Sequence, residues 1–594
     1  AEEEEQHIST GETELDFFVN NIMTPMNRQK GDELPVSAFT GMEDGTFPTG
    51  TSCYEKRGIA LEVPAWDPDR CLQCNQCSLV CPHAVFRPQL ICAEELEEAP
   101  QRIRDLARPA KGYPEKYFYM GFSPMDCTGC GNCLNVCPAR ENALTMVPLA
   151  KREAGEKESW AWLQKRLGEK VIRKEQYSAK ESQFLPSYFE FSGACAGCGE
   201  TPYARLITQL FGDRMMISNS AGCATVWGGS APAVPYRKDD QGHGPAWGFS
   251  LFEDNAEYGL GMFLGYQAVR EEIRAQVESM VGDLAGGQEQ SGAGQAAGGE
   301  SAAGQQALTE AAVTGKDDAH LGVCRERQEL ARAAEEWLTG YGQSQGTRQR
   351  ADALAEALEK NGEIPFVKEI LERKDYLSKR SNWIFGGDGW AYDIGYGGLD
   401  HVLSTGADIN VMVFDTEVYS NTGGQSSKAT PKASIAKFAA AGKQGKKKAL
   451  GMMAMQYKDI YVAQIALGAD PAQALRAVQE AESYPGPSLI IGYAPCVNHG
   501  IKGGMGNTRE QQKNAVEAGY WNLYRYDPGR AEEGKNPFVL DSGKPKTGFR
   551  DFLMSEVRFS SLYKKDPVLA EKLFAEAEQE AMERYEIYRK LSME

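Results

Sequence analysis

The sequence predicts a two-domain α/β protein, with a doubly wound, mostly parallel sheet in the larger domain and an α+β fold in the smaller one. The larger domain is predicted from the chain after about residue 191, where short apolar strands alternate with helical stretches. Strands that alternate with helices favour a parallel sheet covered by helices on both faces. The smaller domain is predicted from two upstream cysteine runs that share the spacing Cys-x2-Cys-x2-Cys-x3-Cys-Pro.

The two cysteine runs predict two [4Fe–4S] clusters, because this spacing with proline after the fourth cysteine is that of such clusters. The first run is Cys71, Cys74, Cys77 and Cys81, and the second is Cys127, Cys130, Cys133 and Cys137. Three cysteines so close together do not fit the two separated pairs of a zinc site. In tandem runs the fourth cysteine ligates the other cluster. We therefore expect one cluster on Cys71, Cys74, Cys77 and Cys137, and the other on Cys127, Cys130, Cys133 and Cys81.

The composition indicates a globular protein of several domains, with 594 residues, 42% of them hydrophobic and 25% charged. A net charge of −19 argues against a nucleic-acid partner and against a membrane-surface protein. No apolar run is long enough for a transmembrane helix. Fifteen cysteines with cluster spacing indicate a reducing intracellular compartment. The first residues, AEEEEQHIST, lack Met and an apolar signal core, so we expect a processed chain or part of a longer one.

The chain divides into five predicted parts. They are a connecting segment at 1–66, the two-cluster domain at 67–150, a linker at 151–190, the larger domain at 191–530 and a helical C-terminal segment at 531–594. The insert between the cysteine runs, from Ile91 to Tyr119, is predicted to be partly helical. Residues 283–308 are rich in Gly, Ala, Gln and Ser and cannot form a core, so we expect a disordered surface insertion there.

Two polar turns follow predicted strands of the larger domain. Gly387-Asp388-Gly389 follows SNWIF, and the stretch 415–424 follows INVMVF. A glycine-rich turn after a strand lets backbone amides approach a phosphate, and ligands of doubly wound sheets bind at these strand ends. Asp388 can ligate Mg²⁺ on a phosphate, and a hydroxyl and a carbonyl of the second turn can complete the metal shell. Each turn is common by itself, but their shared position favours a site.

At these residues the chain resembles the pyruvate:ferredoxin (flavodoxin) oxidoreductase family. GDGWAYDIGYGGLDHVLSTG through DTEVYSNTGGQSSKATPKAS is similar to its thiamine diphosphate domain, and the cysteine runs are similar to its ferredoxin-like domain. The resemblance extends from about Asp32 to Tyr526. It implies a thiamine diphosphate-binding fold for the larger domain and a bacterial-ferredoxin-like fold for the smaller one. It also implies that this chain is the C-terminal half of such an enzyme.

The resemblance implies roles for individual residues. Asp388, the Thr416 side chain and the Val418 carbonyl would hold Mg²⁺ with the diphosphate, beside Gly387 and Gly389. Asn421 would face the reacting carbon and hydrogen-bond the substrate or its adduct.

The resemblance also implies a third [4Fe–4S] cluster near the thiamine, held by Cys195, Cys198, Cys223 and Cys496. Cys223 and Cys496 each follow a predicted strand, so we expect both at the sheet edge that carries Asp388. The other cysteines, Cys53, Cys92 and Cys324, are predicted to be free thiols.

The reaction that the resemblance implies is the oxidation of pyruvate with CoA to acetyl-CoA and CO₂. Three clusters pass single electrons from the thiamine to ferredoxin or flavodoxin, and the complete enzyme is a homodimer. No flavodoxin-like reductase follows, which argues against the NADP-reducing form of the family. Lys446, Lys447 and Lys448 are a candidate steering patch for the carrier, although a solvated loop is the favoured interpretation.

The family's domain for the thiamine pyrimidine ring and the substrate carboxylate has no counterpart here, so we expect this chain alone not to decarboxylate pyruvate. Two alternatives remain: an oxidoreductase for another 2-oxo acid, and a non-catalytic electron-transfer polyferredoxin, against which the Mg²⁺ motif argues. The Ala/Gly/Gln insertion resembles inserts in nuclear genes of green algae. It favours the plastid stroma, with the cytoplasm as the alternative.

Overall fold

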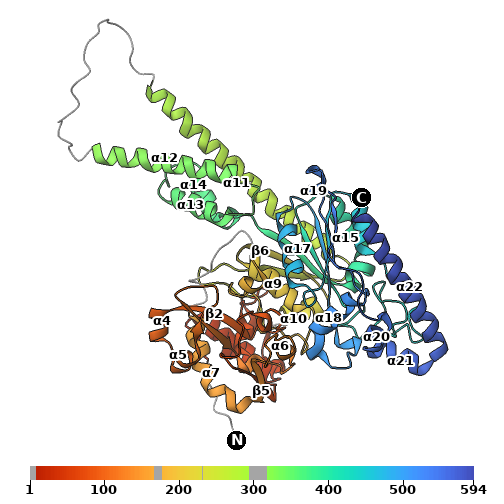
Figure 1. Cartoon of the computed structure of the whole chain (residues 1–594). Helices are drawn as coiled ribbons and strands as arrows, with labels where there is room; N and C mark the ends of the chain where they lie inside the picture. Colours follow the sequence, from red (N-terminus) through yellow and green to blue (C-terminus); the bar gives the residue numbers. More distant parts are fainter. Residues whose placement is uncertain (1–7, 166–176, 230–231, 293–316, 594) are drawn as a thin grey trace, which may run out of the picture. The chain divides into compact units, whose positions relative to one another are not determined.

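The computed structural model of the chain describes residues 8–165, 177–229, 232–292 and 317–593 (Figure 1). The chain forms two compact units, Ala1–Leu260 with Asn382–Glu594 and Gly261–Ser381. Among the described residues, no helix has the length and apolar character needed to cross a membrane.

The first unit contains an eight-stranded sheet in the order β13-β12-β10-β11-β9-β8-β6-β7. The strands are β6 (Met215–Ser220), β7 (Ala246–Ser250), β8 (Ser381–Gly387), β9 (Asn410–Asp415), β10 (Tyr461–Ile465), β11 (Ser488–Tyr493), β12 (Tyr524–Tyr526) and β13 (Phe538–Leu540). The pairs β6–β7, β8–β9, β9–β11 and β10–β11 are parallel, whereas β12 pairs antiparallel with β10 and β13. The predicted mostly parallel sheet is confirmed, and β13 lies beyond the domain boundary predicted at 530.

Helices cover both faces of this sheet. α17 (Pro471–Ser483) packs against β10 and β11, where Ala474 and Val478 share a core with Tyr461. α16 (Leu450–Ala454) lies against the opposite face, beside Val462. α9 (Thr201–Phe211) belongs to the core on the α17 side. The order of strands reverses between β6 and β8, which makes their carboxyl ends the place where a doubly wound sheet binds its ligand.

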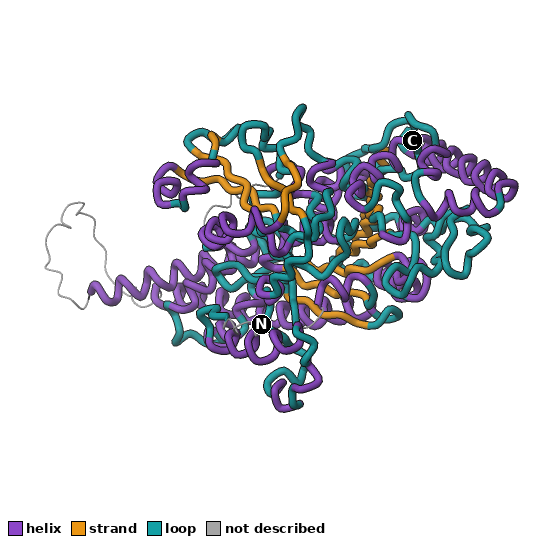
Figure 2. Tube along the Cα trace, turned by 90° about the horizontal axis from the view of Figure 1, so that it is seen from below, coloured by secondary structure: helices purple, strands orange, loops and turns teal. Residues whose placement is uncertain are grey.

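The two-cluster domain is built from two small sheets, which Figure 2 shows apart from the large one. β1 (Glu62–Trp66) pairs with β5 (Leu144–Pro148), and β2 (Phe86–Cys92) and β3 (Arg108–Pro109) both pair with β4 (Lys116–Phe122). Short helices α3 (Gln76–Leu79) and α6 (Asn132–Asn135) lie inside the cysteine runs. The insert between the runs carries α4 (Ala93–Glu98) and α5 (Gln101–Leu106), in agreement with its predicted helices.

The segments before and after the two-cluster domain, predicted as a connecting segment and a linker, contain helices. α1 (Thr13–Phe18), η1 (Val19–Met23) and α2 (Thr24–Asn27) form one continuous helical stretch within the predicted connecting segment. Phe18, Val19, Ile22 and Met23 form a small core there. α7 (Leu149–Gln164), in the predicted linker, packs against β4. Residues 166–176 of that linker lie outside the described residues.

The second unit is a helical subdomain with its own core. It holds most of α11 (Asn255–Gly292) together with α12 (Asp317–Thr339), α13 (Thr347–Glu359) and α14 (Val367–Glu372). The predicted disordered insertion at 283–308 differs from the structure over 283–292, which continues α11. Extension of a helix that is already formed needs no new nucleus, and Leu, Ala, Gln and Glu in this stretch favour it, whereas the glycines oppose it. The rest of the prediction, 293–308, lies outside the described residues.

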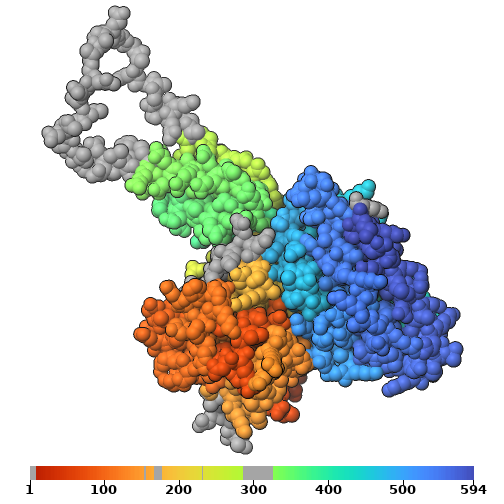
Figure 3. Space-filling model, in the orientation of Figure 1, coloured from red at the N-terminus to blue at the C-terminus, as the bar shows by residue number. Residues whose placement is uncertain are grey.

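The C-terminal segment is mainly helical, as predicted. α20 (Phe549–Met554), α21 (Val557–Lys565) and α22 (Pro567–Leu591) follow β13. The Asp566 side chain caps α22 by accepting a hydrogen bond from the Leu569 amide at 3.0 Å. This segment, dark blue in Figure 3, packs along the larger domain through contacts of α22 with β13.

Candidate functional site

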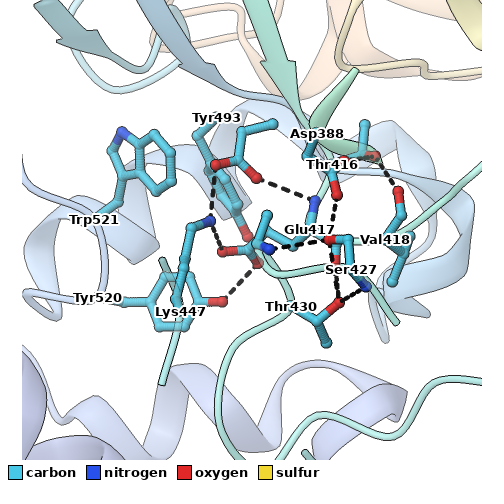
Figure 4. Close-up of polar contacts among 12 residues, drawn as sticks. Asp388, Thr416, Glu417, Val418, Ser427, Thr430, Lys447, Tyr493, Tyr520 and Trp521 are labelled. Atoms are coloured by element: carbon cyan, nitrogen blue, oxygen red, sulfur yellow. Dashed lines mark hydrogen bonds and ion pairs between the residues drawn. The ribbon is translucent and has the colours of Figure 1, made fainter. Parts of the chain in front are cut away.

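Asp388 and the loop after β9 meet at the reversal point of the sheet (Figure 4). Asp388 follows β8 directly, and Thr416 follows β9. The Thr416 hydroxyl lies 2.9 Å from Asp388 Oδ1 and 3.1 Å from the Val418 carbonyl, and all three residues are buried. Oxygens that ligate Mg²⁺ octahedrally at 2.0–2.1 Å lie about 2.9 Å from their neighbours. The three predicted ligands therefore have the spacing of neighbouring positions on one Mg²⁺ ion.

Glu417, between two of these ligands, sets their geometry. Its backbone is left-handed, with φ at 61°, and this turns the Thr416 hydroxyl and the Val418 carbonyl toward Asp388. Such a backbone costs about 1–3 kcal/mol in a residue other than glycine. The Glu417 carboxylate is fixed by Lys447 at 2.8 Å, Arg558 at 2.7 Å and the Tyr520 hydroxyl at 2.6 Å. These contacts hold the turn that carries Thr416 and Val418, hereafter the metal turn, in place before any ligand binds.

The buried charges around this turn leave a surplus of carboxylates. Asp388, Asp415, Glu417 and Glu556 stand against Lys447 and Arg558. Burial raises the pKa of Asp388 well above its ordinary value, and repulsion by Asp415 adds to the effect. Burial opposes ionisation of Glu417, but Lys447 and Arg558 outweigh it and lower the pKa of Glu417 to about 2. A divalent cation beside Asp388 would offset the surplus, so the donor set fits Mg²⁺.

Two serines that the sequence analysis missed complete the turn. Ser427 donates to the second carboxylate oxygen of Asp388 at 2.6 Å. Ser420 lies 3.1 Å from the Thr416 hydroxyl and 3.5 Å from the Cys223 thiol. Ser420 therefore joins the metal turn to one of the cysteines predicted for the third cluster.

The glycines and the asparagine of the predicted site occupy distinct environments. A Cβ on Gly389 would lie 2.5 Å from the Tyr419 ring, so no larger residue fits there. A Cβ on Gly387 would meet no other atom closer than 3.9 Å, which leaves open space beside its backbone. The Asn421 side chain is exposed beside the metal turn.

The four cysteines predicted for the third cluster gather beside the metal turn. The thiol of Cys223 interacts electrostatically with those of Cys198 and Cys496, and that of Cys496 with Cys195. The loops that carry Cys198 and Cys496 pack closely against each other. A Cβ on Gly199 would lie only 2.7 Å from the Pro495 backbone. The buried Glu200 carboxylate accepts a hydrogen bond from Trp227 Nε1 at 2.6 Å. Burial raises the pKa of Glu200 to about 7.

The thiols of the two cysteine runs gather in two sets, each of which contains the fourth cysteine of the other run. The thiol of Cys77 interacts with those of Cys71, Cys74 and Cys137, which come from both runs. The thiols of the other set, Cys81, Cys127, Cys130 and Cys133, line one cavity. Burial raises the pKa of Cys127 to about 12, so a bound cation is needed to hold that sulfur as a thiolate.

Buried polar atoms face both cysteine sets. His83 Nε2 and the Thr128 hydroxyl belong to residues that line the cavity, and both atoms are buried, with the Thr128 hydroxyl facing the Cys130 thiol. Trp66 Nε1 is likewise buried and faces the Cys71 thiol. The sulfurs of an iron–sulfur cluster accept hydrogen bonds of this kind. Among the described residues, no group of three or more His, Cys, Asp or Glu side chains is arranged to hold a single metal ion.

The three cysteine sets form a series in space. Cys133 of the cavity set interacts with Cys77 of the set that contains Cys137. Cys130 of the same set faces the Gly197 amide. Gly197 lies between Cys195 and Cys198. The cavity set is therefore in the middle, and the Cys71 set is the outer one, beside Leu72, which is 50% exposed.

The lysine triplet is not the surface patch that we considered. Lys447, whose side chain is 19% exposed, pairs with the buried Asp415 and Glu417, each at 2.8 Å. Lys448 is half-buried and donates to the Tyr392 carbonyl at 3.1 Å, and Lys446 lies 3.8 Å from Glu580. The sequence shows three adjacent cations but not which of them points inward. The ion pairs of Lys447 with Asp415 and Glu417 place it beside the metal turn.

Comparisons with known proteins agree with both domains. A family model described as a 4Fe-4S dicluster domain matches residues 70–142. The C-terminal TPP binding domain of thiamine pyrophosphate enzymes matches 373–491, and a domain of unknown function matches 2–60. The predicted two-cluster and thiamine diphosphate domains are therefore confirmed.

Curated relatives match along nearly the whole chain. The pyruvate-flavodoxin oxidoreductase of Klebsiella pneumoniae is 53% identical over 97% of this chain and 46% of its own length. The pyruvate:ferredoxin oxidoreductase of Moorella thermoacetica is 50% identical over 98% of this chain and 46% of its own length. This chain spans about half the length of the curated relatives that it matches.

Proposed function

This chain is homologous, over nearly its whole length, to about half of a pyruvate-flavodoxin or pyruvate:ferredoxin oxidoreductase, and we propose that it contributes that half to the same reaction. Pyruvate and CoA give acetyl-CoA, CO₂ and a proton, and two electrons leave singly for ferredoxin or flavodoxin. Pyruvate is proposed rather than another 2-oxo acid because the relatives at 50–53% identity carry that name.

The metal turn is the proposed site of Mg²⁺ and the diphosphate. Asp388, the Thr416 hydroxyl and the Val418 carbonyl would hold the ion, and Gly387 and Gly389 would let the backbone approach the phosphates. Thiamine diphosphate, when bound, supplies an ylid that stabilises the carbanion left by decarboxylation. Asn421, exposed beside this turn, would hydrogen-bond the substrate or its adduct.

The three cysteine sets are the proposed ligands of three [4Fe–4S] clusters. Cys195, Cys198, Cys223 and Cys496 would hold the inner cluster, Cys81, Cys127, Cys130 and Cys133 the middle one, and Cys71, Cys74, Cys77 and Cys137 the outer one. Such clusters, when bound, accept and release single electrons. Leu72 and its exposed neighbours would meet the small carrier protein. The complete enzyme would be a homodimer in a reducing compartment.

The observation that carries this proposal is the position of Ser420. Its hydroxyl lies 3.1 Å from the Thr416 hydroxyl and 3.5 Å from the Cys223 thiol. These two contacts support the proposal that the metal–diphosphate turn and the inner cysteine set belong to one site. A non-catalytic electron carrier has no need of a cysteine set beside such a turn.

The proposal is tested by cluster content and cofactor binding in the anaerobically reconstituted chain. We expect about twelve iron and twelve sulfide per chain, as three cubanes require. Cys223→Ser should lower the iron to about eight, whereas Cys53→Ser, outside the three sets, should leave it unchanged. Asp388→Asn should abolish calorimetric binding of Mg²⁺–thiamine diphosphate at unchanged iron. Full iron in the Cys223 variant, or unchanged binding in the Asp388 variant, would contradict the proposal.

A further inference from the structure

Arg205 reaches from the larger domain into the two-cluster domain. It lies in the middle of α9 and is among the largest fully buried side chains of the described residues, 2% exposed. Its guanidinium donates to the Ser78 carbonyl, to the Ser78 hydroxyl at 3.0 Å and to the Phe86 carbonyl at 3.4 Å. The charge therefore lies between α3 and the start of β2, in the segment that joins Cys77 to Cys81.

The charge of Arg205 has only neutral partners within the part of the chain that the structure describes. No carboxylate pairs with it there, and its Nε is buried without a hydrogen-bond partner. Two other buried arginines differ: Arg214 pairs with Glu482, and Arg558 pairs with Glu417 and Glu556. Arg270 resembles Arg205 in having no carboxylate partner among the described residues, but it donates to the Tyr341 carbonyl and lies outside the cysteine sets. A buried cation without an anion is strongly unfavourable, so a counter-charge is expected beside Arg205.

The side chains that oppose the effect of burial on Arg205 are cysteines of two different sets. Burial lowers the pKa of Arg205, and Cys81 and Cys77 act in the opposite direction. Cys81 belongs to the cavity set and Cys77 to the outer set. A cubane with four thiolates carries net negative charge, which increases on reduction. A fixed cation beside it therefore stabilises the reduced form.

We propose that Arg205 is the shared counter-ion of the middle and outer clusters, and that it raises the reduction potential of both. The inference rests on the proposed function, since it needs clusters on those two cysteine sets. Arg205 acts as a tuning residue through charge and is not itself a ligand. Because α9 belongs to the larger domain, the same side chain also couples the docking of the two domains to the potentials of the relay.

The test is a redox titration of the reconstituted chain, followed by electron paramagnetic resonance. In Arg205→Met and Arg205→Gln, the reduced-to-oxidised ratio of the middle and outer clusters at a fixed potential should fall about tenfold. That change corresponds to a midpoint lowered by about 59 mV for one electron. The inner cluster should not shift. Arg205→Lys, which keeps the charge, should stay near the wild-type midpoints.

A matched control separates charge tuning from loss of packing. Arg214→Met also removes a buried arginine, but one paired with Glu482 and outside the cysteine sets, so its midpoints should equal those of the wild type. If Arg205→Met loses iron, Arg205→Lys decides: wild-type midpoints support the proposal, and lowered ones overturn it. Full iron with unmoved midpoints in Arg205→Met overturns it as well. Fewer than eight iron in the wild-type chain would instead contradict the proposed function.

Discussion

At the level of one residue, Glu417 shows how the contacts of a side chain can stabilise a strained backbone conformation. Its left-handed φ lies between two proposed Mg²⁺ ligands, and the ion pair with Arg558 helps to compensate for the strain. Loss of one partner of a buried ion pair typically costs about 3–5 kcal/mol. The affinity of the site for Mg²⁺–thiamine diphosphate should therefore depend on Arg558, although Arg558 contacts neither group.

We predict that Arg558→Met weakens calorimetric binding of Mg²⁺–thiamine diphosphate about tenfold, which is about 1.4 kcal/mol. Iron content should stay unchanged. Adding Glu417→Gly should recover part of the affinity, because glycine adopts a positive φ without strain and the unpaired carboxylate is removed. Binding by Arg558→Met equal to that of the wild type, or no recovery in the double variant, would refute the role given to Glu417.

The residues of the metal turn divide into those that the sequence could predict and those that it could not. Asp388, Thr416 and Val418 lie in short sequence motifs directly after strands, so the neighbouring residues in the sequence are enough to identify them. Ser427 is 39 positions beyond Asp388, and Arg558 is 141 beyond Glu417. No local pattern connects such pairs. Their roles follow from the way the chain folds back on the sheet.

At the level of elements, the inner cysteine set depends on how closely two loops approach. The backbone after Cys198 meets the backbone before Cys496 at Gly199, where a Cβ would lie 2.7 Å from Pro495. Backbone cannot move aside as a flexible side chain can. Any side chain at position 199 therefore pushes Cys198 and Cys496 apart.

We predict that Gly199→Ala lowers the iron content by about four per chain and leaves the two-cluster domain loaded. Iron analysis and electron paramagnetic resonance would measure the loss. Gly193→Ala is a suitable control, because a Cβ there would meet its nearest atom at an ordinary 3.8 Å. Full iron in the Gly199 variant would show that the loops adapt, and that their contact does not position the thiols.

Elements were predictable where burial is uniform. β9 and β11 are buried along their whole length, and both were recognised as apolar runs. β7 is half exposed, and β12 and β13 have three residues each. None of these three strands therefore has a distinct apolar pattern in the sequence. α11 passed unrecognised through 283–292 because composition suggests disorder there, whereas a long helix already in progress extends through it.

For the whole molecule, the exposed side of the metal turn matters most. Asn421 is exposed, and so are Ile394, at the end of η8 (Gly389–Ile394), and Val497, next to Cys496. Decarboxylation through thiamine diphosphate benefits from a site that excludes water. The curated relatives carry as much sequence again beyond the part that matches.

We predict that this chain alone binds Mg²⁺–thiamine diphosphate weakly and does not release CO₂ from pyruvate with CoA at a useful rate. Addition of the rest of a relative's length, on the same or a separate chain, should restore CO₂ release and viologen reduction. The Asp388→Asn variant of the complemented enzyme is the matched control and should stay inactive. Robust CoA-dependent oxidation of pyruvate by the chain alone would refute this prediction.

The proposed exchange of Cys81 and Cys137 between the two clusters has a consequence for biogenesis. Neither cluster can be completed by a single run, so the delivery of iron and sulfide to one site organises the ligands of the other. Loading should be all-or-none over these two sites, and half-filled chains should be rare at every stage of maturation. Oxidative loss of either cluster should accordingly release both, so that damaged chains are recognised as empty rather than persisting as leaky electron carriers.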